Sequence, residues 1–208
     1  MLTTPSFAEF LRPCGYFDEI WVDSPDDFTR IGEFLKSFEP GGETKVKLHE
    51  RPEPIFDYFG IEVELERALE RRVWLKSGGY IVIDQTEALT AIDVNSGRFV
   101  GKSSLEDTIT QINLEAVKET AYQLRLRNIG GIIVVDFIDM MREESKEIIW
   151  NALTQALKSD RYRTKILKIS EIGLVEMTRK RVRGSLTQTL CDPCIYCEGR
   201  GTNKSPAT

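Results

Sequence analysis

Two aspartates in this chain each stand at the end of an apolar, strand-forming run. Asp93 lies at the end of residues 88–94, and Asp136 directly follows the β-branched run 132–135. The ends of strands in α/β sheets are common ligand sites. Two carboxylates suit Mg²⁺, which takes one or two protein carboxylates together with waters and substrate phosphate oxygens. The pair therefore predicts a magnesium site that acts on a phosphodiester.

Polar residues beside the two aspartates extend this prediction. Asn95 follows Asp93 at a spacing of two, which places both side chains on one face of a strand, and its amide can donate to a phosphate oxygen. Asp139 offers a third carboxylate, or it lies in the turn before the next helix. A lone aspartate at such a place is more often a cap or turn residue, but the spacing to Asn95 weakens that alternative for the pair.

A cysteine cluster near the C-terminus indicates a second metal. It comprises Cys191, Cys194 and Cys197, with glycines at 199 and 201. A C-x-x-C step before glycines favours a turn that directs two thiolates at one zinc. Structural zinc normally takes four protein ligands, so three cysteines leave the shell incomplete. Free thiols in a tail are the alternative.

The charge is unevenly distributed along the sequence. The net charge of −5 argues against a polyanionic partner, yet residues 161–184 contain eight basic and two acidic residues. Such a segment can focus RNA onto one surface. The candidate phosphate contacts are Arg179, Lys180, Arg181 and Arg183. A solubilising helix face is an almost equal alternative.

The one histidine, His49, limits the chemistry. A metal-free nuclease that uses the RNA 2′-hydroxyl would usually need histidine acid–base partners. His49 lies in an edge-strand pattern within another segment, so we expect a structural role for it.

Periodicity predicts an α/β fold. We expect strands at 19–22, 45–49, 80–84, 88–94, 132–135 and 164–169, and helices at 26–38, 55–71, 109–124, 143–158 and 174–182. The first four elements form a β-α-β-α unit, and 80–84 with 88–94 form a hairpin. Ser103 and Glu106 form a capping-box pattern. The run 132–135 has the composition of a strand that is buried on both faces.

The sequence contains no run of roughly 20 apolar residues and no basic region followed by an apolar run at its start. We therefore expect no membrane span and a cytoplasmic protein, in a reducing compartment that fits the cysteine usage.

Four motifs together resemble the catalytic core of the ribonuclease E/G endoribonucleases. They are AIDVNSGR at 91–98, NLEA at 113–116, QLRLR at 123–127 and GGIIVVDFIDM at 130–140. The resemblance implies that Asp93 and Asp136 bind magnesium, that Asn95 contacts phosphate and that Arg163 lies near the RNA path. It also implies that Cys194 and Cys197 form a zinc link, in which two chains share one ion.

The same resemblance implies a domain order and an activity. We expect a ribonuclease H-like segment at 1–70, a deoxyribonuclease I-like mixed-sheet catalytic domain at 71–190 and a zinc-link tail at 191–208. The implied activity is magnesium-dependent cleavage of single-stranded RNA to 5′-phosphate and 3′-hydroxyl ends in rRNA processing and mRNA decay. The implied assembly is a zinc-linked homodimer, with a dimer of dimers as a further step. Cys191 is not part of the simplest form of the zinc-link motif. It either replaces one of the zinc ligands or does not bind the ion.

Two other functions stay open. Family members carry an oligonucleotide-binding domain and a 5′-end sensor ahead of this region, and this sequence has a segment for neither, so we expect a fragment or a short homologue. A non-catalytic RNA-binding or zinc-linked assembly module is therefore the main alternative. A magnesium-dependent deoxyribonuclease is the other, because no local residue reads a 2′-hydroxyl.

Overall fold

The structure is a computed structural model that describes residues 17–38, 42–97, 105–167, 170, 172–197, 199 and 201–202. The chain divides into two units, Met1–Glu66 and Arg67–Thr208. The division falls inside helix α4 (Ile61–Leu69). Within the described ranges, no helix is long and apolar enough to cross a membrane.

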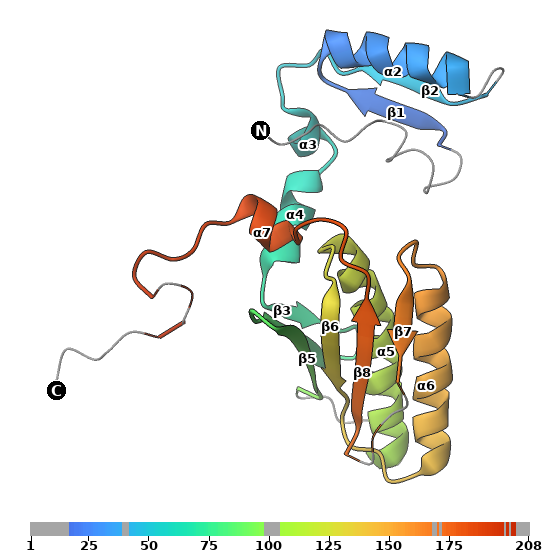
Figure 1. The fold of residues 1–208 in the computed structure, drawn as a ribbon, viewed down its shortest axis with the longest axis vertical. Helices are drawn as coiled ribbons and strands as arrows, with labels where there is room; N and C mark the ends of the chain where they lie inside the picture. The colour runs from blue at the N-terminus through green and yellow to red at the C-terminus, as the bar shows by residue number, and fades with distance from the viewer. Residues whose placement is uncertain are drawn as a thin grey trace. The chain divides into compact units, whose positions relative to one another are not determined.

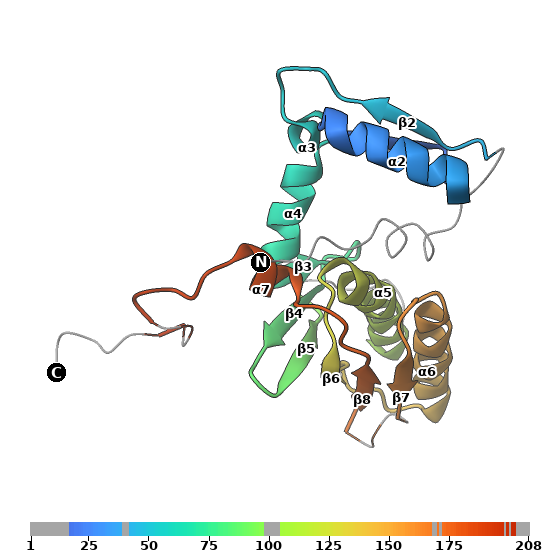
Figure 2. The same cartoon turned by 45° about the horizontal axis from the view of Figure 1, so that its top comes forward.

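The first unit is built around a parallel pair of strands. Strand β1 (Glu19–Val22) pairs with β2 (Lys45–Leu48), and helix α2 (Pro25–Phe38) connects them and packs on the pair (Figures 1 and 2). Helix α3 (Ile55–Tyr58) and the start of α4 follow. The predicted β-α-β-α order is confirmed, except that the expected helix 55–71 is two helices, separated at Gly60, whose φ of 67° a helix does not accommodate.

His49 has the structural role that the sequence predicted. The residue is 7% exposed, and its Nε2 lies 2.7 Å from the carbonyl oxygen of Glu53. The ring also packs against Tyr58, with centroids 5.3 Å apart. The imidazole thus makes both of these contacts within the first unit.

The second unit contains a six-stranded mixed sheet. Its strands are β3 (Arg72–Trp74), β4 (Tyr80–Gln85), β5 (Leu89–Asn95), β6 (Gly131–Asp136), β7 (Thr164–Ile166) and β8 (Leu174–Arg179), in the spatial order β3-β4-β5-β6-β8-β7. Only the β5–β6 pair is parallel among these strands. The predicted hairpin is β4–β5, and the mixed α/β architecture is confirmed.

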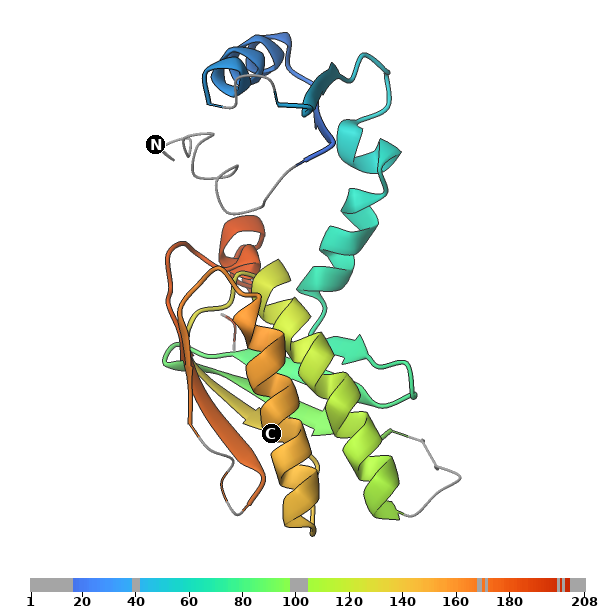
Figure 3. The same cartoon turned by 90° about the vertical axis from the view of Figure 1, so that its right-hand side faces the viewer.

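Two long helices cover one face of this sheet. Helices α5 (Leu105–Leu126) and α6 (Glu143–Lys158) lie side by side on it (Figures 1 and 3). Their fully buried residues, among them Ile112, Leu124 and Leu153, pack on Ile92 and Ile133 of the central strands. The short helix α7 (Leu186–Leu190) begins at Ser185, which forms a capping box with Gln188. Ser103 of the other expected capping box lies outside the described residues.

Two expectations about the sheet were wrong. Residues 174–182 are not a helix but strand β8 and its continuation, since Val175 and Met177 are buried while Glu176 and Thr178 are exposed, a period of two. β8 lies between β6 and β7 and pairs with both, and this pairing outweighs the local helix propensity of the segment. Strand β6 is not buried on both faces, because Ile132 is 52% exposed. The sheet thus has a helix-covered face and an open face.

Candidate active site

The two aspartates of the predicted metal site are direct neighbours across the parallel strand pair. Asp93 and Asp136 are register partners at the carboxyl ends of β5 and β6. The adjacent residues Ile92, Val94 and Val135 point into the core, at 0%, 6% and 0% exposure. Because side chains alternate between the faces of a strand, both carboxylates project from the open face. Their Cα atoms belong to strands roughly 5 Å apart, so the two side chains can contact one small ion.

An open hollow surrounds this pair at the edge of the sheet. It is lined by Asp93, Asn95, Ser96, Asp136, Ile138 and Asp139, among others. The amide Nδ2 of Asn95 donates to Asp93 Oδ2 at 2.7 Å. Asn95 therefore fixes the orientation of one carboxylate, and Asp139 brings a third carboxyl group to the same hollow.

The electrostatics of the hollow favour a cation. Burial raises the pKa of Asp136, and the nearby carboxylates of Asp93 and Asp139 raise it further. A divalent ion would relieve this repulsion. Within the described part of the chain, no cluster of three or more His, Cys, Asp or Glu residues is arranged to hold a metal. Two carboxylates and room for water fit Mg²⁺, which rarely uses an all-protein cage.

A buried asparagine holds the loop that lies beside the carboxylates. Asn113 of α5 is 0% exposed, its Nδ2 donates to the carbonyl oxygen of Ile138 at 2.9 Å, and its Oδ1 accepts from the Ile138 N–H at 3.1 Å. Ile138 lies between Asp136 and Asp139. Sequence reasoning gave Asn113 no role, although a polar residue beside Ile112 and Ala116 on the apolar helix face was a usable signal.

Other contacts fix the surroundings of the site. Glu115 of α5 accepts from the Ser77 N–H at 2.8 Å and so holds the β3–β4 turn. That turn packs closely on the end of β5, because a Cβ added at Gly79 would lie 2.8 Å from the carbonyl oxygen of Asn95. The glycine there permits the approach of turn and strand.

We expect Asn113→Leu to reduce both stability and cleavage. The change leaves the Ile138 N–H and C=O without their partner, at about 1–3 kcal/mol for each buried group. The looser loop should lower cleavage by roughly 10–100-fold, as loss of supporting contacts to metal ligands does. Urea unfolding and cleavage rates measure the two effects. The same change at exposed Gln111 of this helix is the matched control, and an equal loss there would contradict the role of Asn113.

The raised pKa of Asp136 predicts a pH-dependent cost to stability without metal. The folded state binds the proton of the Asp136 carboxyl more tightly than the unfolded state does. The contribution of Asp136 to stability is therefore most favourable when the carboxyl is protonated in both states, and it falls as pH rises through the raised pKa. In a chelator at about pH 7, Asp136→Asn should therefore be at least as stable as the parent, and the difference should shrink toward about pH 4. Urea unfolding at both pH values is the measurement; a destabilised variant at neutral pH would show that the repulsion is unimportant.

Comparison with known proteins agrees with the family that the motifs resemble. The model of the ribonuclease E/G family matches residues 9–182, a range that contains Asp93, Asn95 and Asp136. The chain belongs to the ribonuclease E/G family. It is 49% identical over 191 residues to "Ribonuclease G" of Escherichia coli K12, covering 92% of this chain and 39% of that protein.

Two further relatives show the spread of the family. "Ribonuclease E" of Haemophilus influenzae is 44% identical over 183 residues, which are 88% of this chain and 20% of that protein. "Ribonuclease E/G-like protein, chloroplastic" of Arabidopsis thaliana is 42% identical over 186 residues, 88% of this chain and 19% of that protein. This family member thus spans well under half the length of the relatives it matches.

The predicted RNA-binding residues do not gather at the carboxylates of this ribonuclease E/G family member. Register pairs Arg179 with Gly131, at the opposite end of β6 from Asp136, a separation of roughly 16 Å along the strand. Arg163 and Lys180 are exposed there, and the Lys180 N–H donates to the Arg163 carbonyl oxygen at 3.1 Å. Arg163 and Lys180 therefore lie away from the hollow, toward the opposite end of the sheet.

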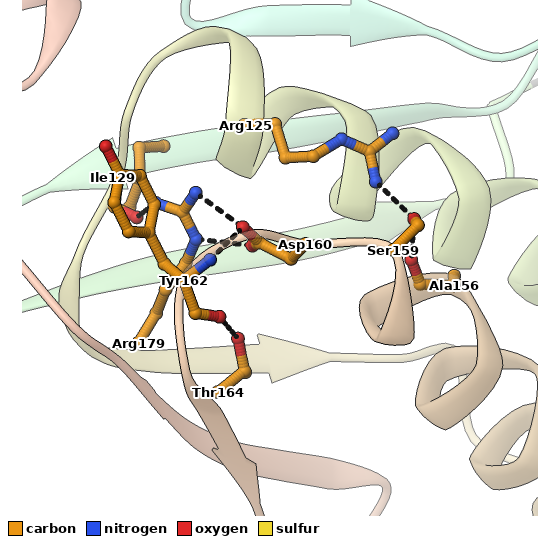
Figure 4. A network of polar contacts seen from close by, with 8 residues as sticks. All are labelled: Arg125, Ile129, Ala156, Ser159, Asp160, Tyr162, Thr164 and Arg179. Carbon is orange, nitrogen blue, oxygen red and sulfur yellow. Dashed lines mark hydrogen bonds and ion pairs between the residues drawn. The ribbon is translucent and has the colours of Figure 1, made fainter. Parts of the chain in front are cut away.

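Arg179 is not a phosphate contact. Its side chain is 2% exposed, with Nε 2.6 Å from Asp160 Oδ2, Nη2 3.1 Å from Asp160 Oδ1 and Nη1 2.6 Å from the Ile129 carbonyl oxygen (Figure 4). The ring of Tyr162 covers the guanidinium at 4.8 Å. Arg179 is therefore a structural residue, and the RNA-binding prediction for it was wrong because it was based on charge alone.

Two other basic side chains lie past the end of β8. Arg181 is exposed, and its Nη2 donates to the Gly130 carbonyl oxygen at 3.0 Å. Arg183 is exposed as well. A phosphate role for Arg163, Lys180, Arg181 and Arg183 stays a prediction.

The cysteines of the predicted zinc link are accessible thiols. Cys191 and Cys194 are exposed and Cys197 is half-buried, with no disulfide among the three. The backbone N–H of Cys197, that of Tyr196 and the Cys197 side chain lower the pKa of the Cys194 thiol. A turn that directs N–H groups at one sulfur favours a thiolate, which suits a zinc ligand. Cys14 lies outside the described residues.

Proposed function

We propose that this chain carries the catalytic centre of a magnesium-dependent endoribonuclease that cleaves single-stranded RNA in RNA processing and decay. The observation that carries the proposal is the register of Asp93 and Asp136, which brings two carboxylates together on the open face of the sheet. The names of the relatives, ribonuclease G and ribonuclease E, support RNA as the substrate. A cytoplasmic location stays a prediction.

The side chains of the site have distinct roles in this proposal. Asp93 and Asp136 would hold the ion, which when bound supplies a Lewis acid and a more acidic water. Asn95 orients Asp93 through one N–H, and the second hydrogen of its amide can donate to a phosphate oxygen. The expected products carry 5′-phosphate and 3′-hydroxyl ends.

Histidine chemistry fits less well than a metal-assisted mechanism. His49 is the one histidine of the sequence, and its Nε2 is engaged with Glu53 inside the first unit. A route through the 2′-hydroxyl, with its usual pair of histidines, has no support among these residues.

The test is cleavage of an end-labelled single-stranded RNA and its DNA counterpart, with Mg²⁺ and with a chelator. We expect cleavage of RNA with Mg²⁺ only, and 5′-phosphate ends that a ligase accepts. Equal cleavage of DNA would favour the deoxyribonuclease alternative. RNA binding without cleavage would favour the non-catalytic assembly module.

We further propose that Cys194 and Cys197 bind zinc together with the same pair of a second chain. Four thiolates complete a tetrahedral structural site, which one chain cannot supply from these two residues. A homodimer follows, and pairing of dimers would build a larger assembly. The turn that favours a Cys194 thiolate supports this assignment.

We expect about one zinc per two chains and a dimer in solution. Cys194→Ser and Cys197→Ser should each lose the zinc and the dimer, measured by metal analysis and light scattering. Cys191→Ser is the comparison variant, and retention of zinc there makes Cys191 a spectator. A monomer that folds normally without zinc would contradict the link.

A further inference from the structure

An arginine and two aromatic residues form a cluster at the edge of the sheet, defined by Arg72 and Trp74 of β3 and Tyr80 of β4. The Trp74 and Tyr80 rings meet edge to face with centroids 5.3 Å apart. The Arg72 guanidinium carbon lies 4.4 Å from the Tyr80 centroid and 5.7 Å from that of Trp74. The guanidinium and the two rings thus fix one another's orientation, although Trp74 remains 62% exposed.

This cluster is on the same open face as the carboxylates. Val73 and Ile81, which neighbour the cluster in sequence, pack toward the core, so Arg72, Trp74 and Tyr80 point the other way. Tyr80 is the register partner of Asn95, and Trp74 is the partner of Tyr80. Trp74 thus lies two strands from β5, roughly 10 Å from the site laterally.

The cluster supplies the positive charge that the carboxylate hollow lacks. Two or three carboxylates repel an RNA strand, and the basic segment near Arg179 is at the far end of the sheet. Arg72 brings positive charge to the near end. In the described part of the chain no acidic residue forms an ion pair with Arg72, whereas its neighbour Arg71 is engaged by Asp84, with Nη2 2.7 Å from Oδ2.

A purely structural role explains this arrangement poorly. Val73 already provides the apolar contact of β3 with the core, so an exposed Trp74 adds little to folding. Unpaired bases stack on exposed aromatic rings and on arginine planes, and every base has a face that can do so. An exposed indole beside an arginine, in line with a phosphodiester-binding site, matches that chemistry.

We propose that Trp74 and Tyr80, oriented by Arg72, stack an unpaired nucleobase of the RNA strand close to the cleaved phosphodiester. This inference rests on the proposed ribonuclease function. The platform accepts any base and positions the strand over Asp93 and Asp136. It would add affinity for single-stranded RNA without reading its sequence.

The test compares cleavage of a short single-site RNA with RNAs that carry one abasic nucleotide at each position around that site. Trp74→Ala should raise KM about tenfold, which corresponds to ~1.4 kcal/mol of stacking, and leave kcat within about twofold. Trp74→Phe, which keeps a ring, should recover most of the affinity. Tyr122→Ala, which removes an exposed aromatic of α5, is the matched control and should change neither constant.

The abasic series separates stacking from a structural effect. In the parent, one abasic position should raise KM by about the same tenfold factor, and in Trp74→Ala that position should have no further effect. Additive losses, or no sensitive position, would overturn the platform.

Binding of a labelled RNA without Mg²⁺ distinguishes this inference from the proposed function. If neither the parent nor any variant cleaves RNA, but Trp74→Ala still weakens RNA binding about tenfold, the stacking platform is supported and the proposed ribonuclease function is wrong. If the parent cleaves and Trp74→Ala behaves like the parent in both assays, the platform is wrong and the function stands.

Discussion

Asp93→Asn and Asp136→Asn should each lower the rate of RNA cleavage at saturating Mg²⁺ by about 10³-fold or more. Each change removes a charged ligand from a two-carboxylate site, and loss of the ion's charge stabilisation corresponds to ~4 kcal/mol in the transition state. Both variants should fold, because both side chains project from the open face. Rates measured on a single-site RNA with matched folded concentrations test this prediction.

Two control variants make the result specific. Asp84→Asn changes another carboxylate on the same face of the sheet, one strand away and paired with Arg71, and it should cleave nearly as the parent does. Asp139→Asn removes the third carboxylate of the hollow and should have a smaller effect than either register partner. Cleavage that persists in Asp93→Asn or Asp136→Asn would exclude that residue as an essential ligand.

Asp160→Asn should cost the second unit about 3–5 kcal/mol of unfolding free energy, because it leaves the Arg179 cation buried without its counter-charge. The two side chains are 0% and 2% exposed, and their closest contact is 2.6 Å. The melting temperature should fall by roughly 10 °C. Calorimetry and urea unfolding measure the change.

The replacement of both partners should be much milder than either single change. Asp160→Leu with Arg179→Met removes both charges, and such apolar replacements are often neutral or stabilising. Glu143→Gln, which removes the exposed partner of half-buried Lys146, is the control and should cost less than ~1 kcal/mol. If Asp160→Asn were as mild as Glu143→Gln, the buried pair would not stabilise the sheet edge.

The pair of aspartates could be singled out from the sequence because each one stands at the end of a strongly apolar strand. Alternation along a strand fixes the face on which Asp93 and Asn95 lie, and the motifs linked Asp93 to Asp136. The register that makes them neighbours is a tertiary property: it depends on the pairing of β5 with β6 across the long helix α5. The sequence therefore pointed to the two aspartates but not to their alignment across the strand pair.

The errors share one physical cause, which is that local pattern does not report tertiary pairing. Residues 174–182 have a composition that also suits a helix. Val175 and Met177 are nevertheless both buried in the core, two positions apart, and this spacing is that of a strand. Arg179 was counted as surface charge because Asp160, nineteen positions earlier, could not be recognised as its partner. Strand β3 is three residues long, too short for periodicity to detect, so the cluster of Arg72, Trp74 and Tyr80 was missed.

The most direct test of the central claim is Mn²⁺ binding followed by electron paramagnetic resonance, with Mn²⁺ in place of Mg²⁺ and no RNA present. We predict one bound ion per chain in the parent and in Asp84→Asn, and loss of that ion in both Asp93→Asn and Asp136→Asn. Undiminished Mn²⁺ binding in either of these two variants would show that the register partners do not share one ion, and would contradict the account.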